Sequence, residues 1–151
     1  MTIAIVLDAG PLGLVTNPRG NDEARACTLW LDALLEQGVT IYIPEIADYE
    51  VRRELLRARK NEGLARLDDL KVVLNYLPIT TMTMLLAANY WATARQQGQP
   101  TAVDHALDGD VILAAQTSLL EQQGYSAVIA TTNVKHLSRF VAAQEWQTIT
   151  Q

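Results

Sequence analysis

The chain has 151 residues, 49% of them hydrophobic and 19% charged, a composition that is typical of one folded domain and excludes a disordered chain. Its 12 lysines and arginines and 17 acids leave a formal net charge of −5, which argues against binding nucleic acid through bulk positive charge. The only cysteine, Cys27, excludes an intrachain disulfide and argues against a cysteine-based zinc site.

Apolar stretches are short throughout the chain. None approaches the roughly 20 residues that a membrane span requires, and the N-terminus lacks the basic segment of a signal peptide. We therefore expect a cytoplasmic protein that does not interact with membranes.

The first half of the chain alternates predicted strands and helices. Apolar β-branched residues predict a strand over 3–7 that is buried on both faces. Glycines and prolines within 9–21 predict turns or a loop. Apolar spacing and turn residues then predict helices over 22–37, 44–60 and 62–74, and strands over 39–43 and 77–80.

The second half continues this alternation. It predicts helices over 83–97, 109–123 and 134–143, a loop over 98–108, a buried strand over 127–131 and an edge strand over 146–150. We expect one α/β domain over 1–151, with three α/β/α layers and a mostly parallel central sheet of four to five strands. Ligands of such sheets bind beyond the carboxyl ends of the strands.

Two acids are candidates for a site at that edge. Asp8 directly follows the first strand, where it either binds a ligand or caps the turn formed by the next residues. Glu50 lies about 40° around its helix from Ile46, beside the apolar face. The alternative for Glu50 is a surface ion pair with Arg53.

Further oxygen ligands follow later in the chain. Asp108 and Asp110 open the apolar helix over 109–123, and Asp104 lies just upstream. Acids at a helix N-terminus are also favoured by the helix dipole. Thr131 and Asn133 follow the strand over 127–131, and Asn133 could simply cap the next helix.

These groups converge if the first and fourth strands are neighbours. Clustered carboxylates repel one another unless a cation joins them. Oxygen ligands without cysteine or a pair of spaced histidines favour Mg²⁺ or Mn²⁺ over zinc. Such an ion suits phosphodiester hydrolysis, and it supplies the positive charge that the side chains lack.

Four segments resemble the motifs of PIN-domain nucleases, in the order of that family. They are IVLDAGPL at 5–12, IPEIADYEVRREL at 43–55, LDGDVILAA at 107–115 and ATTNVKHL at 130–137. The resemblance implies a VapC-like PIN domain: an Mg²⁺- or Mn²⁺-dependent endoribonuclease, the toxin of a toxin–antitoxin pair, with RNA as substrate. It also implies a small antitoxin partner and a homodimer.

The resemblance carries over to particular residues. It implies that Asp8, Glu50 and Asp110 bind the metal or activate water, and that Asp108 and Asn133 are further metal ligands. Asp104 and Thr131 are additional candidates. Asn133 stands where many members have Asp and His136 where some have an acid, which makes the number of metals uncertain.

The basic residues of the 44–60 helix have two interpretations. Arg52, Arg53 and Arg57 form either a solvated face or a surface that tracks RNA phosphates. Two rivals to the nuclease hypothesis also stand. One is a non-catalytic PIN-like module that binds RNA or protein through a weakened metal site, and the other is a phosphatase-like domain with Asp8 as nucleophile.

Overall fold

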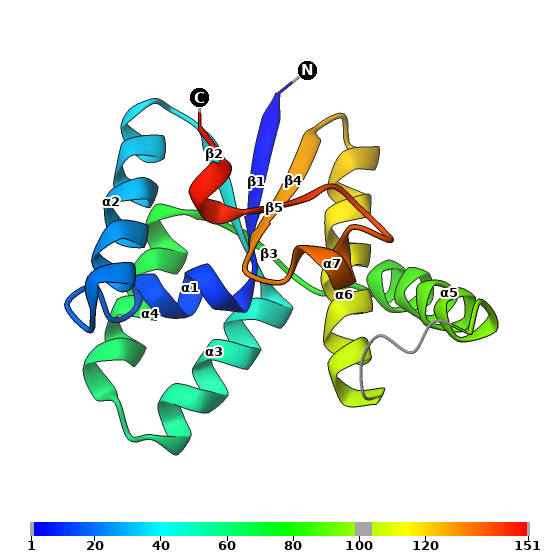
Figure 1. Ribbon diagram of the computed structural model, residues 1–151, viewed down its shortest axis with the longest axis horizontal. Coiled ribbons are helices and arrows are strands. Elements are labelled where there is room, and N and C mark those ends of the chain that lie inside the picture. The colour runs from blue at the N-terminus through cyan, green and yellow to red at the C-terminus, as the bar shows by residue number, and fades with distance from the viewer. Residues whose placement is uncertain (1, 99–103, 151) are drawn as a thin grey trace.

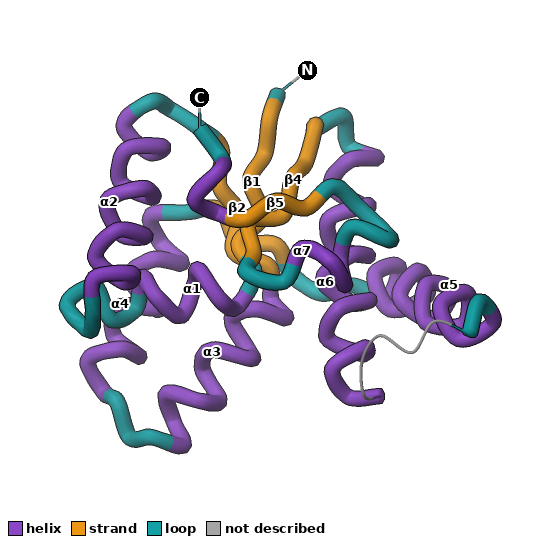
Figure 2. The backbone as a smooth tube through the Cα atoms, in the orientation of Figure 1, coloured by secondary structure: helices purple, strands orange, loops and turns teal. Residues whose placement is uncertain are grey.

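The computed structural model describes residues 2–98 and 104–150, except for the side chains of 104–106. The described residues form a five-stranded, all-parallel sheet in the order β3-β2-β1-β4-β5 (Figures 1 and 2). The strands are β1 (Ile3–Leu7), β2 (Thr40–Pro44), β3 (Asn75–Leu77), β4 (Ser126–Thr131) and β5 (Ala143–Glu145). The predicted strand number and parallel arrangement are confirmed.

Helices cover both faces of this sheet, as Figure 1 shows. One face packs against α1 (Ala9–Val15), α2 (Asp22–Glu36), α3 (Glu45–Arg57) and α4 (Asn61–Val73). The other packs against α6 (Asp104–Gln122) and α7 (Val134–Leu137), with α5 (Thr81–Gln96) lying on α6. The predicted three-layer architecture is confirmed.

The central strands explain why the polar groups at their ends meet. β1 pairs with β4 in a register that places Leu7 opposite Ala130, and the Asp8 amide donates to the Ala130 carbonyl at 3.0 Å. β1 and β4 are therefore neighbours, as the convergence of the acids requires. Residues after both strands lie at one edge of the sheet.

The prediction of a loop at 9–21 was wrong for its first part. Residues 9–15 form α1, and Asp8 caps it by accepting a hydrogen bond from the Ala9 amide at 2.7 Å. Pro11 lies in the first turn, where helical amides lack intrahelical acceptors, so its missing N–H does no harm.

Two predicted boundaries on the α5–α6 side also shift. The loop expected over 98–108 is helical from Asp104, and the buried Leu107 and Val111 of this extension pack with Ala87 and Ala94 of α5. This packing supplies the reason for the longer helix. The third strand ends at Leu77, because Thr80 begins α5 with a capping box.

The C-terminal segment differs most from the prediction. The helix expected over 134–143 ends at Leu137, the edge strand lies at 143–145, and η1 (Trp146–Thr148) is a 3₁₀ turn. Trp146 is buried against Trp30, with ring centroids 5.6 Å apart. This contact turns the chain away from the sheet at the residues where the edge strand was predicted.

Candidate metal centre at the carboxyl ends of β1 and β4

Asp8 lies at the end of β1 and is held by bonds to both carboxylate oxygens. Oδ1 accepts from the Ala9 amide and Oδ2 accepts from the Thr131 hydroxyl, each at 2.7 Å. Burial raises the pKa of Asp8, and these two bonds oppose that rise because they favour the ionised form. Asp8 therefore caps α1 through one carboxylate oxygen and also lies in the candidate site, so the two interpretations do not exclude each other.

Thr131 connects Asp8 to the segment after β4. Its side chain is fully buried, and its hydroxyl also accepts a hydrogen bond from the Asn133 amide at 2.8 Å. The Asn133 side chain is exposed and contacts Nδ1 of His136 at 3.2 Å, and within the described residues it makes no capping bond to α7. Its oxygen therefore stays at the rim of the site.

Glu50 extends from α3 toward α6. A Cβ added to Gly109 would lie 3.2 Å from Glu50 Oε2, so the glycine leaves room for this carboxylate. Burial raises the pKa of Glu50, and the charges of Asp8 and Asp110 add to the rise, while Arg53 opposes it. The alternative pairing with Arg53 is also present, at 4.0 Å.

Asp110 is the acid of this group whose negative charge is least compensated. Burial and then the charge of Asp8 raise its pKa to about 6, and His136 and Arg139 limit the rise. Its Oδ2 is buried and has no hydrogen-bond partner among the described residues, although Nδ1 of His136 lies 3.7 Å away. A buried, unsatisfied carboxylate oxygen is unfavourable without a cation.

Asp108, a neighbouring acid of α6, lies on a different face of the helix from Asp110. Asp108 is exposed, because two residues along a helix correspond to a rotation of about 200° from Asp110. The side chain of Asp104 lies outside the described residues. The structure therefore brings together Asp8, Glu50 and Asp110, with Thr131 behind them and Asn133 at the rim.

The chemistry of this group fits Mg²⁺ or Mn²⁺, because its donors are carboxylate oxygens and one of them is buried without a hydrogen-bond partner among the described residues. Within the described residues, no three acidic, histidine or cysteine side chains are close enough to hold an ion as they stand. The mutual repulsion visible in the raised pKa values of Glu50 and Asp110 favours such separation. A cation would have to draw the carboxylates together.

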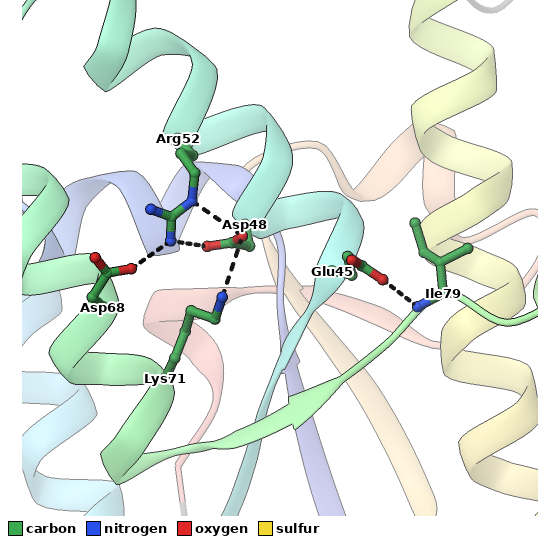
Figure 3. A network of polar contacts seen from close by, with 6 residues as sticks. All are labelled: Glu45, Asp48, Arg52, Asp68, Lys71 and Ile79. Atoms are coloured by element: carbon green, nitrogen blue, oxygen red, sulfur yellow. Dashed lines mark hydrogen bonds and ion pairs between the residues drawn. The ribbon is translucent and has the colours of Figure 1, made fainter.

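The arginines predicted to track phosphates have partners within the chain. Arg52 pairs with Asp48 at 3.0 Å and with Asp68 at 2.7 Å (Figure 3). Arg57 pairs with Glu54 at 2.7 Å. Arg53 lies over the ring of Tyr49 at 5.2 Å, in addition to its contact with Glu50.

Sequence reasoning missed the contacts that hold α3 in place. Figure 3 shows the buried Asp48 of α3 between Arg52 of the same helix and Lys71 of α4. It also shows the Glu45 carboxylate, which accepts a hydrogen bond from the Ile79 amide at 2.7 Å. On the other side, Gln116 of α6 accepts from the Ile46 amide at 3.3 Å. These bonds join segments far apart in sequence, and only a buried glutamine in an apolar helix hinted at them.

Several solved structures share this fold. VapBC-1 from nontypeable Haemophilus influenzae aligns with a TM-score of 0.70 and 18% identity, over 97% of this chain and 100% of the other. FitAcB from Neisseria gonorrhoeae gives 0.70 and 18%, over 96% and 99%. VapBC2 from Rickettsia felis, bound to a DNA fragment from their promoter, gives 0.69 and 17%, over 94% and 98%.

No protein-family model and no curated protein matches the chain. The structural matches confirm the PIN-like three-layer fold over nearly the whole chain. In the described part of the chain, none of the helices combines the length and apolar character needed to cross a membrane.

Proposed function

We propose that the chain is an Mg²⁺- or Mn²⁺-dependent endoribonuclease, the VapC-like toxin of a toxin–antitoxin pair. One observation carries the proposal: carboxylates from β1, α3 and α6 face one another, and Oδ2 of Asp110 is buried without a hydrogen-bond partner among the described residues. The motif resemblance and the fold of the VapBC structures support it.

The residues of the site would have different roles in hydrolysis. A bound ion neutralises phosphate charge and acidifies water. Asp8, oriented by Ala9 and Thr131, and Asp110, on the rigid α6, would hold that ion. Glu50 would accept the proton of the attacking water, because its raised pKa makes it a better base than an ordinary carboxylate. His136 and Arg139 would limit the negative charge around Asp110.

RNA cleavage measured with Mn²⁺ tests this proposal. EDTA is expected to abolish cleavage, and Asp110→Asn is expected to lower it by roughly 100-fold or more, because the amide cannot supply the same charge to the ion. Asp69→Asn, which alters an exposed acid of α4, serves as the control and should cleave normally. Cleavage that persists in EDTA and in Asp110→Asn would refute the assignment.

A second candidate function is a non-catalytic module that binds RNA or protein. Asn133 favours it, because an exposed amide supplies a neutral oxygen where an acid would bind a second ion more strongly. Titration with Mn²⁺ distinguishes the two functions. Failure to bind the ion at millimolar concentration would favour the module.

We also propose a small antitoxin as partner, since the matched structures are named as VapBC and FitAcB assemblies. Co-expression with the product of an adjacent small reading frame tests this, and a failure to co-purify would count against it. The cytoplasm is the proposed compartment, consistent with Cys27 as a buried free thiol.

We also propose that the chain forms a homodimer. The exposed Met82, Met84 and Leu85 of α5 offer an apolar surface for self-association. Sedimentation equilibrium should show a dimer, and Leu85→Glu should shift it toward monomer. A monomeric wild-type chain at high micromolar concentration would exclude the dimer.

A further inference from the structure

Two connected hollows lead away from the acid site. The inner one, about 350 Å³, lies between α1 and α3 and reaches Ala9 and Glu50. The outer one, about 930 Å³, lies between the end of α1, the start of α2 and the turn from α3 to α4. Both are lined by Gly13, Leu55 and Lys60, so they form one continuous groove, which we call the α1–α3 groove.

The outer end of the α1–α3 groove concentrates positive charge on an acidic protein. Among the described residues, four cationic side chains line it against one carboxylate, Glu62: they are Arg19, Arg59, Lys60 and Arg66. These are four of only 12 lysines and arginines in a chain with 17 acids. Such local enrichment makes a positive patch that the net charge of −5 conceals.

Most of these cations are available to a ligand. Within the described part of the chain, the side chains of Arg19, Arg59 and Lys60 make no ion pair or hydrogen bond, whereas Arg52 and Arg57 on α3 are paired. Arg59 has φ 56°, and this left-handed residue turns the chain so that residues 59 and 60 both line the hollow. Arg66 donates to the Val15 carbonyl at 2.6 Å and keeps its charge.

We propose that the α1–α3 groove binds the phosphate backbone of a single RNA strand that leads away from the bond to be cut. Arg19, Arg59 and Lys60 contact its phosphates, and the helical stretch from Glu50 to Arg57 corresponds to about 10 Å along α3, with Arg59 and Lys60 in the turn beyond it. The choice of RNA rests on the proposed function, whereas the phosphate chemistry rests on the groove itself.

Binding of RNA in EDTA, measured by fluorescence anisotropy, tests the groove without requiring cleavage. The variant carries Arg59→Gln together with Lys60→Gln, two exposed positions whose change should leave the fold intact. It should bind an oligonucleotide that spans the groove roughly tenfold more weakly and a dinucleotide unchanged. The slope of log K against log salt should fall by about 1.4, at about 0.7 per lost phosphate contact.

The matched control is Arg95→Gln on α5, which removes a charge on the other side of the molecule (Figure 1). Equal weakening by the control, or an unchanged salt slope in the groove variant, would overturn the proposal. So would unchanged RNA binding combined with lost binding of polyglutamate, which would assign the groove to an acidic protein segment. RNA binding that depends on the groove but is never followed by cleavage would support the groove and count against the proposed function.

Discussion

At the scale of single residues, the site is defined by carboxylates whose charges are unfavourable without a cation. The Asp8 carboxylate is stabilised because it accepts two hydrogen bonds. Asp110, in contrast, has a buried oxygen without a hydrogen-bond partner among the described residues, and its pKa is raised to about 6. Such a group lowers stability whenever it is ionised. A bound cation would remove this loss of stability.

The stability of the metal-free protein should therefore depend on Asp110 in a pH-dependent way. Because folding raises its pKa from 3.8 to about 6, the folded state binds more protons between these values, and stability falls as pH rises through this window. At pH 7, Asp110→Asn should raise the free energy of unfolding by on the order of 2 kcal/mol.

Urea unfolding in EDTA measures this effect, with Asp69→Asn as the control on an exposed acid. The gain should shrink as pH falls from 6 to 4 and vanish below about pH 3, because Asp110 is then protonated in both states. A gain of equal size at pH 4 and pH 7 would show that the carboxylate charge is not its cause. The same ionisation predicts weaker Mn²⁺ binding below about pH 6.

At the scale of elements, the placement of α3 decides where Glu50 lies. α3 begins after Pro44, whose side chain has no acceptor for the first helical amides. Gln116 of α6 supplies one by accepting from the Ile46 amide, and its Nε2 donates to the Leu77 carbonyl at 2.7 Å. Gln116 thus joins the helix of Asp110 to the start of the helix of Glu50.

Loss of this connection should loosen the metal site. Gln116→Leu leaves the Ile46 amide and the Leu77 carbonyl without this partner, and we expect Mn²⁺ affinity to fall roughly tenfold, as for other groups that orient ligands. Thr117→Val is the matched control, because the buried Thr117 hydroxyl bonds only within α6, to the Leu113 carbonyl, among the described residues.

Both substitutions should lower the free energy of unfolding by about 1–3 kcal/mol. Only Gln116→Leu should change the Mn²⁺ affinity, measured by electron paramagnetic resonance under folded conditions. Equal affinities in the two variants would show that Gln116 contributes stability alone.

At the scale of the whole molecule, the C-terminal segment closes the fold against α2. Trp30 Nε1 donates to the Ile149 carbonyl at 2.9 Å, and its ring packs at 59° to the buried ring of Trp146. The hydrogen bond from Trp30 thus joins residues 119 positions apart. The contact lies directly after β5, which pairs with β4 at the edge of the sheet.

Trp30→Phe should therefore destabilise the protein as a whole. The ring contact is largely kept, but the Ile149 carbonyl loses its donor, so the free energy of unfolding should fall by about 1 kcal/mol. Trp91→Phe on α5 is the control, because the Trp91 side chain is more exposed. Urea unfolding measures both, and an unchanged Trp30→Phe midpoint would exclude a stabilising role for this hydrogen bond.

The sequence by itself determined most of the element types and the three-layer class, because the periodicity of apolar residues is a local property. It also determined which acids could converge, since Asp8 follows β1 and Thr131 ends β4, and parallel strands end at one edge. Signals of the same local kind are Asn21, which caps α2, and Gly38 and Gly124, which follow their helices with positive φ.

Tertiary structure alone decided the remainder. Trp146, buried against Trp30, begins a 3₁₀ turn where a strand was predicted, and Asp48 and Asp68 pair with Arg52. Arg59 and Lys60, at the turn from α3 to α4, make no ion pair or hydrogen bond among the described residues. The reason is physical: burial and ion pairing depend on which distant residues meet, and a local pattern contains no information about its partners.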